Sequence, residues 1–187
     1  MCRRVYASLL GLAKLRIQCC GILIKEMRDS TINYKLVRPS LNVFKWKPPD
    51  QGSYKINCKA VIDVRGGWIG LGIVIRDVSG LVMASCSLRI AAGVDDWATN
   101  SLAILKSIQF GSECGMFPFI IEFDAKKVVN WNNNSSHVNS NYGTILGDID
   151  GLSSHWSGSN INWVPAVCNT VALGLAKEAL KLDEDQF

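Results

Sequence analysis

Tyr54-Lys-Ile-Asn-Cys-Lys-Ala-Val61 begins with apolar and polar side chains in alternation, which is the period of a strand with one buried face. Two further apolar runs follow it, Trp68–Arg76 and Leu81–Leu88. Short glycine-containing segments, 64–67 and 77–80, separate the three runs and are typical of tight turns. We therefore expect a three-stranded antiparallel meander on which the rest of the domain packs.

The chain after the meander alternates between helical and strand patterns. Apolar residues at helical spacing follow the helix-capping pair Asp95-Asp96, and Gly115 and Pro118 end that helix. The remaining pattern predicts a strand at Phe119–Phe123, a helix at Asp124–Asn130, a loop at Asn130–Ser140, a helix at Gly143–Ser154, a strand at Asn160–Val164 and a last helix from its cap Asn169 to Leu180. The order βββαβαβα predicts an α/β fold with a mixed five-stranded sheet flanked by helices.

The length of 187 residues suits one domain with an extension. A hydrophobic content of 48% with 19% charged residues is normal for a globular core. We expect a basic N-terminal extension with a marginal helix at 1–43, a Pro/Gly linker at 44–52, the folded domain at 53–181 and an acidic tail at 182–187. The seven cysteines form no C-x-x-C pair and are interpreted as reduced thiols of an intracellular, monomeric protein, cytoplasmic or nuclear.

Positive charge is concentrated in the N-terminal part. Residues 1–47 contain ten Lys/Arg and two Asp/Glu, whereas residues 48–187 contain ten Lys/Arg and fourteen Asp/Glu. We expect weak nucleic-acid binding through this arm, with the candidate residues Arg3, Arg4, Lys14, Arg16, Lys45 and Lys47. Charges interrupt its apolar patches, so no membrane span is expected. An organelle transit peptide and a basic helix left over from a longer parent protein are both open interpretations.

Several motifs resemble the plant ribonuclease H-like family, which consists of type 1 ribonuclease H domains often derived from retroelement reverse transcriptases. The matching segments are Trp46-Lys-Pro-Pro49, Gly52-Ser-Tyr-Lys-Ile-Asn57, Ile73-Val-Ile-Arg-Asp77 and Gly80. The resemblance covers roughly residues 44–181. It implies the ribonuclease H-like fold and, for an intact member, hydrolysis of RNA in an RNA–DNA hybrid. That reaction uses two Mg²⁺ ions held by carboxylates.

The resemblance implies four metal-binding acids, which can be compared with this chain one by one. Where the family writes Asn-x-Asp-Gly-Ala, the acid is replaced by Lys59; in the Ala-Glu-Ala-x-Ala pattern it is replaced by Asn100. Asp124 is retained after the fourth strand. In the family's Asn-x-x-Ala-Asp/His-x-Leu-Ala-Lys, the acid or histidine is replaced by Leu173. If Lys59 projects into the site, we expect it to pair with Asp124.

Each of these residues also has a purely structural interpretation. Lys59 suits the solvated face of its strand, and Asn100 is tolerated in the first turn of a helix. Leu173 suits packing on a helix face, and Asp124 suits a helix N-cap.

Three functional hypotheses follow. The first is a catalytically degenerate ribonuclease H-like domain without a bound metal, which binds RNA or an RNA–DNA hybrid weakly or serves protein partners. The alternative is an active Mg²⁺-dependent hybrid ribonuclease with a rebuilt site, for which Asp63, Asp77 and Glu122 are the nearest carboxylates. The third is a retroelement-derived fragment without a selected biochemical role.

Overall fold

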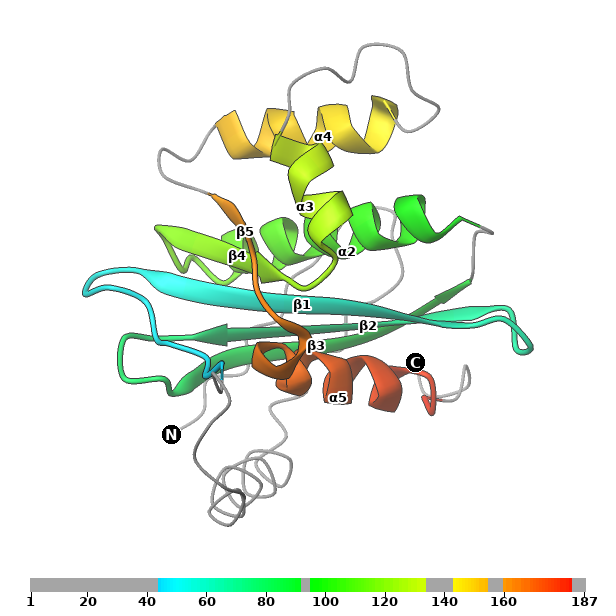
Figure 1. The fold of residues 1–187 in the computed structure, drawn as a ribbon, viewed down its shortest axis with the longest axis horizontal. Coiled ribbons are helices and arrows are strands. Elements are labelled where there is room, and N and C mark those ends of the chain that lie inside the picture. The colour runs from blue at the N-terminus through cyan, green and yellow to red at the C-terminus, as the bar shows by residue number, and fades with distance from the viewer. Residues whose placement is uncertain (1–43, 92–94, 134–142, 155–159, 183–187) are drawn as a thin grey trace.

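The computed structural model describes residues 44–91, 95–133, 143–154 and 160–182. Five strands form one sheet in the order β3-β2-β1-β4-β5 (Figure 1). β1 pairs antiparallel with β2, β2 antiparallel with β3, β1 parallel with β4, and β4 parallel with β5. The strands are β1 (Tyr54–Asp63), β2 (Trp68–Arg76), β3 (Val82–Ala91), β4 (Phe119–Phe123) and β5 (Ile161–Trp163). The predicted mixed sheet is confirmed.

Helices cover both faces of this sheet. On one side lie α2 (Asp96–Glu113), α3 (Lys126–Asn133) and α4 (Gly143–Ser154); on the other lies α5 (Thr170–Ala179), after the short 3-10 helix η1 (Ala166–Cys168) (Figure 1). The Asp95 carboxylate accepts from the Trp97 backbone N–H at 2.7 Å, so the predicted cap of α2 is confirmed.

Two helix predictions need correction. α3 begins two residues later than expected and continues to Asn133, so 130–133 is helical and not part of a loop. The side chain of Asn169 makes no capping hydrogen bond to α5. Its amide donates instead to the Cys58 carbonyl oxygen and to the Asp124 carboxylate.

The larger core lies between the sheet and α2. On β1, the side chains of Ile56 and Cys58 point to this face and are fully buried. The smaller core, formed by Val74, Ala172 and Leu175, lies between β2 and α5. The alternation of β1 therefore places its polar residues on the α5 side of the sheet.

Two glycines of β2 let α5 approach this sheet face closely. A Cβ atom at Gly70 would lie 2.0 Å from the carbonyl oxygen of Ala176, and one at Gly72 would lie 2.2 Å from that of Ala172. Any side chain at these positions would push the helix outward. The close approach brings the N-terminus of α5 to the sheet beside β1 and β4.

Residues 44–52, the predicted linker, pack on the domain through one aromatic side chain. Trp46 donates its indole N–H to Glu122 at 2.7 Å, and the Arg76 guanidinium lies 3.8 Å from its ring centroid. Pro49 is buried as well. The predicted extension 1–43, with Arg3, Arg4, Lys14 and Arg16, lies outside the described residues, as does the tail beyond Leu182. None of the described helices is long and apolar enough to cross a bilayer.

Candidate functional site

An ion pair joins β1 to the end of β4. The Lys59 ammonium lies 2.7 Å from Oδ2 of Asp124, the residue that follows β4. Register explains the contact, because Asn57 pairs with Glu122 across the parallel strands and each partner lies two residues further along. The Asp124 side chain is only 9% exposed and that of Lys59 23%. This is a partly buried, charge-assisted hydrogen bond.

Asn169 is the second hydrogen-bond donor to the Asp124 carboxylate. Its side-chain amide donates to Oδ1 of Asp124 at 3.0 Å and to the carbonyl oxygen of Cys58 at 2.9 Å. The residue is 1% exposed, so these bonds replace the capping role predicted for it. Both carboxylate oxygens of Asp124 thus have a donor. Sequence reasoning missed this function, although Asn169 begins the motif that contains Leu173.

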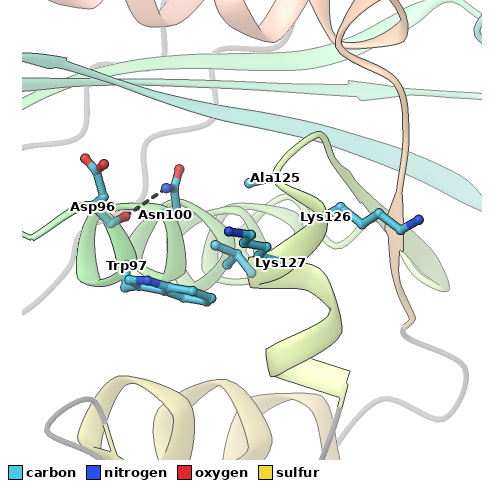
Figure 2. Close-up of a pocket in the computed structure, with 7 residues that line it drawn as sticks. Asp96, Trp97, Asn100, Ala125, Lys126 and Lys127 are labelled. Carbon is cyan, nitrogen blue, oxygen red and sulfur yellow. Dashed lines mark hydrogen bonds between the residues drawn. The ribbon is translucent and has the colours of Figure 1, made fainter.

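Asn100 and Leu173 contribute little to this cluster. The Asn100 amide donates to the Asp96 carbonyl within its own helix at 2.8 Å. It lines a pocket of about 290 Å³ between the starts of α2 and α3 (Figure 2). Leu173 lies in the first turn of α5 and is half-buried. Its hydrocarbon side chain offers no ligand atom, and the bond made by Asn100 agrees with its structural interpretation.

Glu122 is enclosed by a second polar cluster on the same sheet face. Lys55 lies 2.6 Å from Oε1, while Trp46 and Asn57 donate to Oε2. Arg76 donates to the Asn57 side-chain oxygen at 2.9 Å. Burial lowers the pKa of Arg76 from 12.5 to about 10, an effect that the nearby Glu122 carboxylate partly offsets. Glu122 therefore belongs to a structural network that fastens the N-terminal segment.

The two other carboxylates considered for a rebuilt site organise turns. Asp63 accepts from the backbone N–H groups of Arg65 and Gly66, and Asp77 accepts from those of Ser79 and Leu81. Within the described ranges, no three His, Cys, Asp or Glu side chains gather in a way that could hold a metal.

A pair of Mg²⁺ ions does not fit the donors at the four predicted positions. Mg²⁺ requires several oxygen ligands at close range. Asp124 offers one carboxylate that already accepts from two donors, and Lys59 places an ammonium beside it. Like unit charges 4 Å apart repel by about 4 kcal/mol at an effective dielectric of 20, and a divalent ion doubles that cost.

An exposed aromatic ring is hydrogen-bonded to the backbone of Asp124. Trp163, at the end of β5, donates its indole N–H to the backbone carbonyl of Asp124 at 3.1 Å and is 42% exposed. The Lys126 ammonium lies 5.2 Å from its ring centroid.

Two predicted nucleic-acid contacts, Lys45 and Lys47, are exposed at the N-terminal segment, and their role stays a prediction.

Solved structures share this fold at low sequence identity. Ribonuclease H1 from Halobacterium salinarum superposes with a TM-score of 0.61 and 17% identity, covering 69% of this chain and 98% of that one. The N-terminal RNase H domain of rv2228c from Mycobacterium tuberculosis gives 0.57 and 23%, covering 69% and 95%. A foamy viral protease-reverse transcriptase in complex with an RNA/DNA hybrid gives 0.57 and 15%, covering 80% and 23%.

No curated protein matches the sequence significantly. The sequence model of the family described as "Reverse transcriptase-like" matches residues 57–179, which contain all five strands except the first three residues of β1, and helices α2 to α5. The chain therefore belongs to the reverse transcriptase-like family, and its domain has the ribonuclease H-like fold.

Proposed function

We propose that this chain is a ribonuclease H-like domain that has kept the fold and lost phosphodiester hydrolysis. The observation that supports the proposal is the 2.7 Å contact between the Lys59 ammonium and the Asp124 carboxylate. It places a fixed cation against the retained acid. The chain would then act through binding, to nucleic acid or to a protein partner.

Charge is the physical reason. An intact family site would offer up to four negative charges to two divalent ions, whereas Lys59 and Asp124 together sum to zero. Asn100 adds a neutral oxygen and Leu173 adds none. Without several anionic ligands, neither ion has a favourable place, and the attacking water has no Lewis acid to activate it.

The test is cleavage of a labelled RNA–DNA hybrid in Mg²⁺ or Mn²⁺. We expect no product above the enzyme-free control. Asp124→Asn identifies the source of any product that does form. Cleavage that survives this change comes from a contaminating nuclease, whereas cleavage that it abolishes overturns the proposal.

A gain-of-function variant sharpens this experiment. Lys59→Asp, Asn100→Glu and Leu173→Asp combined return acids to all the changed positions. Isothermal titration should then detect Mg²⁺ binding by the triple variant and none by the wild type. Specific Mg²⁺ binding by the wild type that is lost in Asp124→Asn would favour the alternative, an active hybrid ribonuclease with a rebuilt site.

The contacts of the candidate replacement carboxylates weigh against that alternative. Glu122 is held by Lys55, Trp46 and Asn57, and the other two lie in turns. The foamy viral structure contains an RNA/DNA hybrid. We propose that nucleic acid is also the ligand of the present chain, and that the basic arm before residue 48 contributes to binding.

A further inference from the structure

We propose that Lys59 holds a backbone phosphate of a bound nucleic-acid strand directly, so that binding at this site needs no metal. The inference rests on the proposed function in one respect, namely that the site binds no Mg²⁺. The group that Lys59 would bind is a phosphodiester. An ammonium then neutralises the phosphate charge that divalent ions would otherwise neutralise.

Lys59 has donors available for such a contact. An ammonium carries three N–H groups, and Asp124 accepts one of them at 2.7 Å. The Lys59 side chain is 23% exposed, whereas that of Asp124 is 9% exposed. The cation is thus the partner that reaches solvent. Asp124 holds the ammonium at the end of β4, and Asn169 in turn donates to Asp124.

Further positive charge follows Asp124 closely in the sequence. Lys126 and Lys127 are exposed at the start of α3, two and three residues after Asp124. Both line the pocket with Asp96, whose carboxylate is the opposing charge there. Counting Asp96 and Asp124 against the three lysines leaves one positive charge. This is a local exception in residues 48–187, where acids outnumber Lys/Arg by fourteen to ten.

Trp163 supplies a surface for the sugar or base next to that phosphate. Its indole N–H donates to the backbone carbonyl of Asp124, and 42% of the residue is exposed. Exposed aromatic rings flanked by cations bind nucleic-acid strands through stacking together with phosphate contacts. A nucleic-acid strand suits this combination better than an acidic peptide, which would use the cations and not the ring.

The experiment measures binding of a fluorescent RNA–DNA hybrid to the full chain in EDTA, over a series of salt concentrations. We expect binding to persist in EDTA. Lys59→Ala should weaken it several-fold and lower the slope of log affinity against log salt by about 1. Lys181→Ala is the matched control. It removes the same charge from an exposed lysine just beyond the far end of α5.

A second variant predicts a change of opposite sign. Asp124→Asn removes a negative charge and releases Lys59, so it should tighten binding in EDTA. If the site bound nucleic acid through a metal, the same variant would weaken binding in Mg²⁺. Circular dichroism verifies that each variant is folded.

The inference is overturned by binding that disappears in EDTA, by equal effects of Lys59→Ala and Lys181→Ala, or by weaker binding of Asp124→Asn. Double-stranded RNA, double-stranded DNA and single-stranded RNA probes then identify which strand supplies the phosphate. An acidic peptide that competes as well as the hybrid would also contradict it. Gel analysis of the samples that contain Mg²⁺ measures cleavage separately. Failure of the proposed function is therefore distinguishable from failure of this inference.

Discussion

Lys59 and Asp124 form an ion pair where the family resemblance implies a metal-binding acid. Lys59→Met should destabilise the fold by ~2 kcal/mol, since it leaves a carboxylate that is 9% exposed without its charged donor. Urea unfolding at pH 7 measures the loss. The Asn169 amide still donates to Asp124, so we expect the domain to remain folded.

A double variant separates the charge from the packing. Lys59→Met with Asp124→Asn removes both charges and should recover most of the lost stability. If Lys59→Met costs no more than Lys181→Met, the ion pair contributes nothing measurable, as is common for exposed pairs.

Glu122 on β4 connects the N-terminal segment to the sheet. Trp46, Lys55 and Asn57 all contact this carboxylate, and the Trp46 ring lies against Arg76. Composition alone favours a linker here, because Pro48, Pro49 and Gly52 lie close together. A tryptophan in such a segment is the signal that it packs on the domain.

Contact between α5 and β2 gives a prediction at the scale of elements. Gly70→Ala should destabilise the domain by ~2 kcal/mol or more, because the new Cβ would lie 2.0 Å from the Ala176 carbonyl oxygen. Gly147→Ala is the matched control, in an exposed part of α4 where a Cβ meets nothing within 4 Å. It should stabilise by ~0.5–1 kcal/mol. Thermal unfolding compares the two, and equal shifts would contradict the close packing.

For the whole molecule, the strand and helix pattern of residues 54–180 was predictable because it depends on local periodicity. Sequence also identified Lys59 and Asp124 as the positions to compare. Their pairing was expected if Lys59 projected into the site, and the register of β1 against β4 is what brings the two side chains together. The two bonds of Asn169 join β1 and the end of β4 to the start of α5 across more than forty residues, so local capping rules predicted the wrong role. Glu122 was missed as a structural anchor for the same reason.

Buried thiols make the stability of the whole domain sensitive to alkaline pH. Burial raises the pKa of Cys58 and of Cys86 from 9.0 to about 12. Above pH 9 the unfolded chain therefore loses these protons before the folded one does, and stability falls as pH rises. From pH 9 to 10 each thiol should cost ~1 kcal/mol, about 2 kcal/mol for both. Arg76 acts in the opposite sense, because its folded pKa is lowered, but only near and above pH 10.

Urea unfolding under reducing conditions at pH 8, 9 and 10 measures this loss. Cys86→Ala should lower stability at every pH because it leaves a small cavity, yet its decrease between pH 9 and 10 should be ~1 kcal/mol smaller than that of the wild type. Cys168, whose pKa burial also raises, adds to the decrease in both proteins. A wild-type stability that stays constant from pH 9 to 10 would mean that solvent reaches these thiols, and the core between β1 and β3 would then be looser than the structure shows.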